Sequence, residues 1–439
     1  LRERDIATVY AWFIATKRTM AVVSQGVNQS SAGTDKVNAI VNCHLATGRV
    51  GQPGSGPFSV TGQPNAMGGR EVGGLANQLA AHMDFAQPAA IDRVARFWGA
   101  PDIATKPGLK AVDLFDAVLD GRVKALWIMA TNPAASMPNA GRVRRALEAC
   151  PFVVVSDCWN TDTSRYAHVL LPAASWSEKN GTVTNSERRI SRQRAFCPPP
   201  GEARADWWML TEVARRLGWG NAFPYDGPAA IFREHARLSA FENDGTRVFD
   251  IGALAGLTDD QYRDLAPVRW PLAADERGPA DGRLFGDGVF ATPDGRGRFV
   301  PTPYRGPAET TDRRRAFVLN TGRIRDQWHT MTRTGRVPRL MTHQDEPWLD
   351  VNPRDAARLG LAAGDLVRVE TAHGAAILRA RPSDNQRPGD VFVAMHWTDD
   401  FTSAGPIDRL VGNARDPISG QPELKATPAR LAPAPTLWR

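Results

Sequence analysis

Short apolar runs alternate with polar loops along the first quarter of the chain. Residues 19–24 have the pattern of a short buried strand, and the polar segment 25–30 follows as a loop. A helix is predicted from about residue 35 to residue 46. The Gly- and Pro-rich stretch 51–74 is too irregular for a helix. Since a long loop inside a compact domain is usually functional, we expect an incomplete α/β domain over residues 1–115 with a functional loop.

A clearer alternation follows over residues 116–312. An apolar run at 123–129 predicts a buried strand, 143–149 a helix, and 152–155 a second strand, which is a parallel βαβ pattern. Residues 207–217 place apolar side chains on one helical face, with Asp206 as the expected N-cap and Gly218 as the stop. This region is expected to be a second α/β domain.

The last third of the chain changes character. Residues 225–315 are rich in Pro, Gly and Asp and are expected to wrap the surface. Beyond them, short apolar or alternating strands at 316–320, 365–371, 375–380 and 391–394 are punctuated by glycines such as those of His373-Gly374 and Gly389-Asp390. The sequence therefore predicts a β-barrel domain over residues 313–439.

Charge and cysteine content narrow the class of protein. The net charge is +7, and Arg dominates the basic residues. This suits an anionic ligand because the guanidinium fork matches phosphate and small oxyanions, although an Arg-preferring genome explains the same excess. The chain has no long basic run, so binding to nucleic acid is not expected. It also has no run of about 18 apolar residues, so a transmembrane helix is not expected. The four cysteines lack C-x-x-C spacing, so they are expected to be packing residues in a reduced, cytoplasmic protein.

Polar loops that follow predicted strands are the first candidates for a binding site. In open α/β sheets, ligands bind beyond the carboxyl ends of strands, where backbone N–H groups and helix N-termini hold phosphates. The loops at 25–30, 131–136 and 156–157 have this form, and none carries the G-x-G-x-x-G fingerprint of a nicotinamide dinucleotide site. Each loop by itself is a weak signal.

Two denser segments strengthen the case. Residues 180–189 bring two Asn, two Thr, a Gly and a Glu-Arg-Arg triplet together, and a surface ion pair is the plainer interpretation. Residues 320–334 put hydroxyl groups, an imidazole, an indole and three guanidinium groups after a strand. Such a loop suits a pyrophosphate and a polar heterocycle, whereas His329 alone is more often a satisfied polar residue.

Long ordered motifs give the chain a family resemblance. L-P-A-A-S-W-S-E-K-N-G-T-V-T-N-S-E-R-R at 171–189, T-G-R-I-R-D-Q-W-H-T-M-T-R-T at 321–334 and T-G-Q-P-N-A-M-G-G-R-E-V-G-G at 61–74 resemble signatures of the molybdopterin oxidoreductases. M-H-W-T at 395–398 and D-P-I-S-G-Q-P-E-L-K at 416–425 complete the pattern, which is closest to the assimilatory nitrate reductases. The resemblance implies that the C-terminal barrel is of the double-psi type.

The resemblance also implies a cofactor, a molybdenum ion held by two molybdopterin guanine dinucleotides. Its binding residues fall into five groups along the chain. The first two groups are Gly26, Asn28 and Gln29, then Gly62, Gln63 and Pro64. The third, for one nucleotide, is Thr131, Asn132, Pro133, Ser136, Ser156 and Asp157. The fourth is Asn180, Gly181, Thr182, Asn185, Glu187 and Arg188, and the fifth, for the other nucleotide, is Thr321, Gly322, Arg323, Gln327, Trp328, His329, Thr330, His396, Asn413 and Lys425.

The sequence also departs from the family pattern. The family's cysteine-rich cluster motif is absent, and none of the four cysteines stands in a recognisable molybdenum-ligand motif. Cys43 is expected to be structural. The charged start, Leu1 to Asp5, has the character of the middle of a longer gene product. We therefore expect a fragment that is inactive by itself, with a 4Fe-4S cluster belonging to the missing N-terminal region.

The function implied is nitrate reduction to nitrite, with electrons from a donor protein or domain. Met67 is expected near the substrate funnel, although simple packing in a Gly-rich loop explains it equally well. Two alternatives stay open: a formate dehydrogenase-type subunit on the same scaffold, and a non-catalytic fragment that completes a partner.

Overall fold

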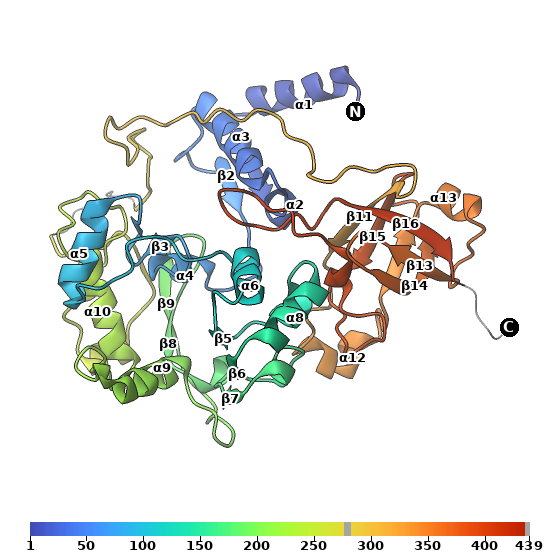
Figure 1. Cartoon of the computed structure of the whole chain (residues 1–439). Coiled ribbons are helices and arrows are strands. Elements are labelled where there is room, and N and C mark those ends of the chain that lie inside the picture. Colours follow the sequence, from blue (N-terminus) through green and yellow to red (C-terminus); the bar gives the residue numbers. More distant parts are fainter. Residues whose placement is uncertain (276–281, 435–439) are drawn as a thin grey trace. The chain divides into compact units, whose positions relative to one another are not determined.

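The computed structural model describes residues 1–275 and 282–434 (Figure 1). These residues form two compact units, each built from three separate segments of the chain. Unit 1 comprises residues 1–25, 37–109 and 173–302, and unit 2 comprises residues 26–36, 110–172 and 303–439. The three-region division expected from the sequence stays a prediction. Within the described residues, no helix is long and apolar enough to cross a membrane.

Unit 1 combines small sheets with helices. Its core gathers Phe232, Phe249 and Trp270 with residues of the helices and short strands around them. The helices are α1 (Glu3–Ala15), α4 (Ala66–Glu71), α5 (Pro88–Trp98), α9 (Asp206–Ala214), α10 (Pro228–Ala240) and α11 (Asp259–Arg263). The strands are β1 (Met20–Val23), β2 (Gly56–Ser59), β3 (Gln78–Leu79), β4 (Met83–Asp84), β8 (Gly181–Thr184), β9 (Arg189–Gln193) and β10 (Val268–Arg269). Helices α2 (Gln25–Asn28) and α3 (Gly33–Ala46) have residues in both units.

Two of the small sheets of unit 1 differ in strand direction. Strands β1 and β2 form a two-stranded parallel sheet in which Val22 is the register partner of Phe58. Strands β8, β9 and β10 form an antiparallel sheet.

Unit 2 begins with a three-stranded parallel sheet in the order β5-β6-β7. Strand β6 is the central strand, and its residues Val153 and Val155 are buried between the sheet and α6 and α8. The predicted βαβ pattern is therefore confirmed. The elements are α6 (Ala111–Leu119), β5 (Ala125–Met129), α7 (Pro133–Ser136), α8 (Ala140–Ala149), β6 (Phe152–Asp157) and β7 (Val169–Pro172).

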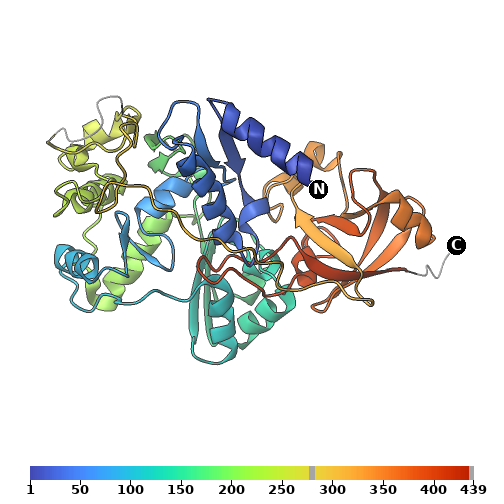
Figure 2. The same ribbon diagram turned by 90° about the horizontal axis from the view of Figure 1, so that it is seen from above.

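The rest of unit 2 contains a closed six-stranded barrel, coloured orange to red in Figure 1 and turned by 90° in Figure 2. Alternate residues of its strands point inward, and Leu319, Val369 and Val393 are fully buried. This confirms the predicted barrel. The strands are β11 (Phe317–Gly322), β12 (Trp348–Val351), β13 (Leu366–Glu370), β14 (Ala375–Pro382), β15 (Asp390–Ala394) and β16 (Thr427–Pro433), with the short helices α12 (Pro338–Met341) and α13 (Pro353–Arg358).

The mixture of α/β units with parallel sheets and a C-terminal barrel confirms the predicted fold class, but several local predictions are wrong. The stretch 51–74 contains β2 and α4, and the predicted loop 25–30 contains the single turn α2. Asp206 does not cap α9: the cap position is Ala205, and the Asp206 carboxylate instead pairs with Lys179 Nζ at 2.7 Å. Tertiary contacts outweigh local propensity in each case.

The largest correction concerns residues 225–315. They were expected to wrap the surface, yet α10 and the side chains of Phe249 and Trp270 lie in the core of unit 1. Pro and Gly are frequent there because turns connect these buried pieces. Residues 276–281 of this stretch lie outside the described residues. Of the cysteines, Cys150 packs in the sheet core as expected, whereas Cys158 is half-buried at a strand end.

Candidate functional site

The carboxyl ends of β5, β6 and β7 meet at one edge of their sheet; the sequence predicted the strand ends of β5 and β6 but not β7. Asp157 ends β6, and a pocket at this edge is lined by Asp157, Cys158, Trp159 and Asn160 together with residues that end β7. Burial raises the pKa of Asp157, while hydrogen bonds and Arg333 lower it. The hydrogen bonds and the charge of Arg333 therefore offset part of the rise in the pKa of Asp157 that burial causes.

Arg336 connects a barrel loop with this sheet edge. Its guanidinium carbon lies 4.5 Å from the centre of the Trp159 ring. Arg333 comes from the same segment, which follows β11. The 321–334 motif and the β6 loop are therefore neighbours within unit 2, which is what one shared ligand site requires.

Asn132 holds the loop after β5 in shape. Its side chain is buried, accepts hydrogen bonds from the Thr163 N–H at 3.1 Å and hydroxyl at 2.7 Å, and donates to Asp162 at 3.2 Å. Ser136 donates to the Asn132 carbonyl at 2.9 Å. The side chains of both residues thus bond to protein atoms, whereas Thr131 is exposed at the sheet edge.

The second strand-end cluster lies on the barrel. Strands β11 and β15 are parallel neighbours, so Arg323 and His396, which follow them, leave the barrel at the same end. A Cβ at Gly322 would lie 2.7 Å from the Phe392 ring, so a larger residue there would displace that ring. The chain after Gly322 carries Arg323 over the Trp328 ring, with 5.3 Å from guanidinium carbon to ring centre.

Two neutral histidines organise this cluster. His396 Nε2 accepts a hydrogen bond from the Ile324 N–H at 3.0 Å, so its Nδ1 carries the proton and donates to the His329 carbonyl at 2.7 Å. Burial lowers the pKa of both rings to about 4. Arg323 Nη2 lies 2.8 Å from His329 Nε2, which must be the acceptor, and His329 Nδ1–H remains a donor.

Lys425 adds a second positive charge beside Arg323. Its ammonium donates to the Thr321 carbonyl, and burial lowers its pKa. Asp408 opposes that lowering, and burial raises its own pKa to about 8. Asp408 is a buried carboxylic acid behind the site that sequence reasoning missed, because nothing in the local segment 407–410 marks it.

Most other predicted residues near the barrel have structural contacts. Gln327 is buried, accepts from the Thr334 hydroxyl at 2.6 Å and donates to the Leu340 carbonyl at 3.3 Å. The Thr321 hydroxyl donates to the Leu424 carbonyl at 2.8 Å. Thr330 is buried, and Asn413 is half-buried. These residues shape the loops that carry Arg323, His329 and Lys425.

Residues 26–36 belong to unit 2 although the strand before them lies in unit 1. The Ser31 N–H and hydroxyl donate to Glu423 at 3.0 and 2.8 Å, and Thr34 donates to Asp416 through its N–H at 3.0 Å. Two acidic residues of the 416–425 motif thus tie down the segment that carries Gly26, Asn28 and Gln29. Sequence reasoning found the motif but assigned no role to these carboxylates.

In unit 1, several of the predicted cofactor-binding residues make hydrogen bonds to protein atoms. Both terminal nitrogens of Arg188 donate to backbone carbonyls, those of Trp270 and Gly282, each at 2.5 Å. Asn185 accepts from the N–H groups of Glu187 and Arg189, both at 3.0 Å, and so closes its own turn. Gly62, Gln63, Pro64 and Asn180 are exposed, while Gly181 and Thr182 belong to β8.

Glu71 explains why these loops hold their shape. This buried carboxylate accepts from the Thr184 hydroxyl at 2.8 Å and from the Trp270 indole at 2.7 Å. Burial raises its pKa against those two bonds. Met67, in the same helix, is half-buried and packs against the core of unit 1. The 61–74 motif therefore reaches the 180–189 motif through Glu71, a link that no local pattern reveals.

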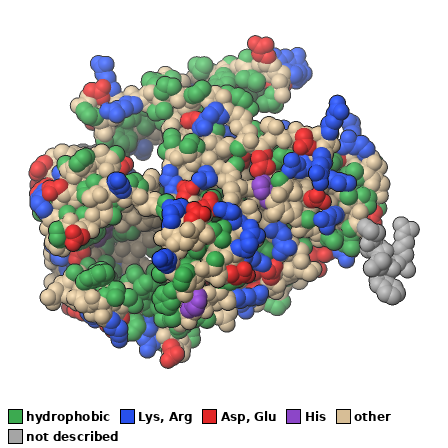
Figure 3. Space-filling view, viewed as in Figure 1, with side chains coloured by type: hydrophobic (Ala, Val, Ile, Leu, Met, Phe, Trp, Pro, Cys, Tyr) green, Lys and Arg blue, Asp and Glu red, His purple; other side chains and the backbone are tan. Residues whose placement is uncertain are grey.

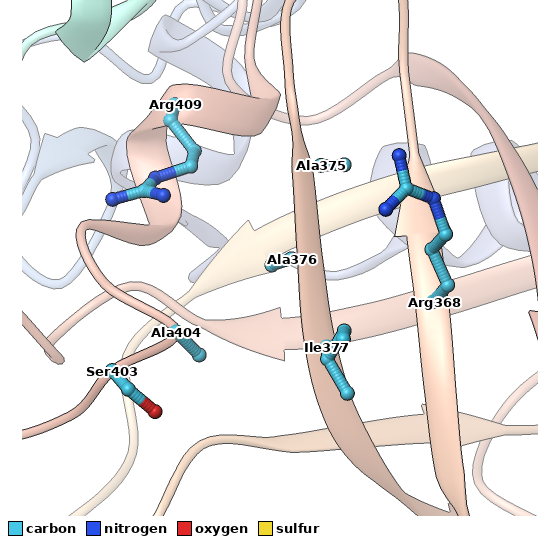
Figure 4. A pocket seen from close by; sticks show the side chains of 7 residues that line it. All are labelled: Arg368, Ala375, Ala376, Ile377, Ser403, Ala404 and Arg409. Carbon is cyan, nitrogen blue, oxygen red and sulfur yellow. The ribbon is translucent and has the colours of Figure 1, made fainter. Parts of the chain in front are cut away.

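A further pocket lies on the outside of the barrel and contains none of the predicted residues (Figure 4). Ala375, Ala376 and Ile377 of β14 line it with Arg368 and Arg409. The two guanidinium groups lie on opposite sides of β14 in this view and do not point toward each other. Because the charges do not converge, the strand-end clusters remain the better candidate site.

Comparisons with known proteins point to one family. Residues 8–216 match the family described as molybdopterin oxidoreductase, and residues 317–428 match the molydopterin dinucleotide binding domain. A nitrate reductase of Klebsiella oxytoca is 51% identical over 100% of this chain and 50% of its own length. A nitrate reductase of Shewanella frigidimarina is 44% identical over 98% of this chain and 48% of its own length. The chain thus spans about half the length of these curated relatives.

Two more distant matches complete the picture. The F420-dependent formate dehydrogenase subunit alpha of Methanocaldococcus jannaschii is 33% identical over 94% of this chain and 58% of its own length. The solved structure of the acetylene hydratase from Pelobacter acetylenicus superposes with a TM-score of 0.57 over 73% of this chain and 46% of that one, at 21% identity. The last match bears on the fold alone.

Proposed function

The chain belongs to the molybdopterin oxidoreductases, and we propose that it is part of a nitrate reductase catalytic subunit that reduces nitrate to nitrite. The observation that carries the proposal is the identity of 51% and 44% with nitrate reductases over nearly the whole chain. A formate dehydrogenase subunit of the same fold reaches 33%. The formate alternative is therefore the weaker one.

The chemistry of the barrel end fits the cofactor that this family implies. Arg323 and Lys425 supply positive charge for phosphate oxygens, and Trp328 and His329 offer flat faces and N–H donors for a heterocycle. His329 and His396 are neutral near pH 7, so the positive charge of this cluster comes from Arg323 and Lys425. We assign one nucleotide end of a bis-molybdopterin guanine dinucleotide to this cluster and the other to Asp157 and the loop after β5.

When bound, the molybdenum supplies the two-electron redox change that turns nitrate and two protons into nitrite and water. The described residues orient the cofactor and give its surroundings positive potential. We propose that residues of unit 1, Gln63, Asn185 and Met67 among them, also contribute to cofactor binding. We also assign a 4Fe-4S cluster to the part of the relatives' length that this chain does not span, and we place the enzyme in the cytoplasm with a separate electron donor.

The test is to restore the missing length. The chain would be fused behind the part of the Klebsiella oxytoca nitrate reductase that it does not match, and the product assayed with reduced viologen and nitrate, then with formate and an oxidised dye. We expect nitrate turnover and no formate oxidation. Formate activity without nitrate activity would overturn the assignment. The unfused chain should show neither activity and should contain no stoichiometric iron, because its cysteine spacing supports no cluster.

A further inference from the structure

Helix α1 is apolar beyond its charged first turn and yet lies on the surface. None of its 13 residues is buried, and Trp12 and Ile14 are 68% and 66% exposed. In Figure 3 green side chains lie along this helix at the top of the view. Inside its unit, α1 is held near its C-terminus: Phe13 contacts the His44 ring edge-on, and Arg49 donates to the carbonyls of Ile14 and Thr16. A helical segment as apolar as residues 6–15 is normally covered.

The β1–β2 sheet, which follows α1, also exposes apolar side chains on one face. Register pairs place Val22 and Phe58 on one face of the β1–β2 sheet, and Met20 and Val60 continue that face. All four side chains are exposed, with Val22 at 63%. Parallel sheets are stable when both faces are covered, and a two-stranded sheet by itself is marginal. Among the described residues, neither outer edge of this sheet has a pairing strand.

The order of elements says what kind of polypeptide would cover this surface. The chain β1, α3, β2 is a complete βαβ unit with parallel strands. Helix α1 leads into β1 through four residues, an order that matches the second half of such a unit. The strand that begins a βαβ unit runs parallel to the strand that ends it, in the same sheet.

We propose that α1 and the Met20, Val22, Phe58 and Val60 face form a docking surface for an α/β polypeptide that adds parallel strands to the β1–β2 sheet and a helix over its open face. The occupant is the remainder of a catalytic subunit, in accordance with the proposed function, since the chain spans about half the length of its relatives. A contiguous exposed apolar patch of this kind marks an interaction surface.

The experiment supplies that occupant as a separate polypeptide. The chain would be co-expressed with the part of the Klebsiella oxytoca nitrate reductase that it does not match, and the product analysed by size exclusion with light scattering. We expect a one-to-one complex, and hydrogen exchange at the β1 and Val60 amides at least tenfold slower than in the chain alone. Protection elsewhere with unchanged exchange in β1 would overturn the proposal.

A double variant, Val22→Glu with Phe58→Glu, tests the face itself. Both side chains are exposed, so the charges should leave the thermal midpoint of the chain unchanged while weakening the complex at least 100-fold. The matched control is Phe196→Glu, which charges an equally apolar side chain that is 82% exposed elsewhere in unit 1. Equal complex formation by both variants would contradict the proposal. So would a homodimer that the double variant disrupts, because a second copy would then be the occupant.

The outcome is separable from that of the proposed function. A complex that forms through this face but reduces no nitrate would leave the docking surface standing and remove the nitrate assignment. A covalent fusion that reduces nitrate while the separate halves ignore this face would do the reverse.

Discussion

Arg188 in unit 1 and Arg323 in unit 2 stand in motifs of similar density, yet the structure uses them differently. The Arg188 fork donates to two backbone carbonyls and its guanidinium carbon lies 5.3 Å from the centre of the Trp270 ring. Among the described residues, the Arg323 fork makes one hydrogen bond, to His329, and the residue is exposed. A dense polar motif therefore does not separate residues that hold a ligand from residues that hold the loop. The two kinds of residue differ in how many hydrogen-bond donors remain free of protein partners.

The same contrast holds for the buried acids. Glu71 in unit 1 accepts hydrogen bonds from Thr184 and Trp270. Asp408 in unit 2 is buried with one carboxylate oxygen that lacks a hydrogen-bond partner among the described residues, and Lys425 is the charge that favours its ionised form. The Glu71 carboxylate thus has protein donors, whereas one oxygen of Asp408 has none among the described residues.

The largest expected effect comes from removing the fork of Arg188. Arg188→Ala leaves two carbonyls without their charged donor and should destabilise unit 1 by about 2–4 kcal/mol. Arg188→Lys should recover little, because an ammonium cannot span both carbonyls. Hydrogen exchange in β8 and β9 measures the change within the unit. Exchange as slow as in the wild type would mean that Arg188 is not a structural residue and would restore it as a ligand contact.

A somewhat smaller effect is expected from pH acting on His396. Its folded pKa of about 4 lies below the ordinary value of 6.5, so the unfolded chain binds more protons between these values. The stability that His396 contributes is present above pH 6.5 and is lost as the pH falls toward 4, by about 1–3 kcal/mol. Thermal midpoints against pH should show this decline and a flatter curve for His396→Gln. The exposed His343→Gln is the control, and identical curves for both variants would refute the buried neutral ring.

The sequence predicted the elements that have local signals and missed the contacts between distant residues. The barrel strands at 316–320, 375–380 and 391–394 were predicted because apolar alternation and glycine turns are local signals. Strand β16 was missed because its prolines disguise it. The Glu71 contact with Trp270 joins positions 199 residues apart and leaves no local trace.

Sequence reasoning located the loops of the candidate site by three different routes. The loops after β5 and β6 were located from the rule for strand ends, the loop after β11 from its density of polar groups after a strand, and the loop after β15 from the family resemblance. What the sequence could not give is which polar groups bond to other protein atoms. Asn132, Gln327 and Arg188 are of the right type and position, and their hydrogen bonds to protein atoms become visible once the loops are folded.

A binding effect with little change in stability is expected at Arg323. Arg323→Ala should weaken binding of GDP, used as a probe of the nucleotide end, about tenfold, equivalent to roughly 1.4 kcal/mol, and the difference from wild type should grow as salt is lowered. The thermal midpoint should stay the same. Arg325→Ala is the matched control, since Arg325 lies in the same loop and pairs with Asp326 at 2.9 Å. Calorimetric titration that gives equal loss for both variants would remove Arg323 from the site.

The smallest effect is expected at Met67, for which both core packing and a role in the substrate site are considered. It packs against the core of unit 1 while remaining half-buried, and we propose that its exposed part shapes the substrate funnel. Met67→Leu keeps the volume and should cost less than about 1 kcal/mol in stability, whereas Met67→Ala should cost more. In the restored enzyme, Met67→Leu should lower nitrate turnover about two- to fivefold, an increase of roughly 0.4–1 kcal/mol in the barrier, with molybdenum content unchanged. Full turnover in Met67→Leu combined with a lower thermal midpoint in Met67→Ala would make Met67 a packing residue, and the contrast between the units would then extend to this position.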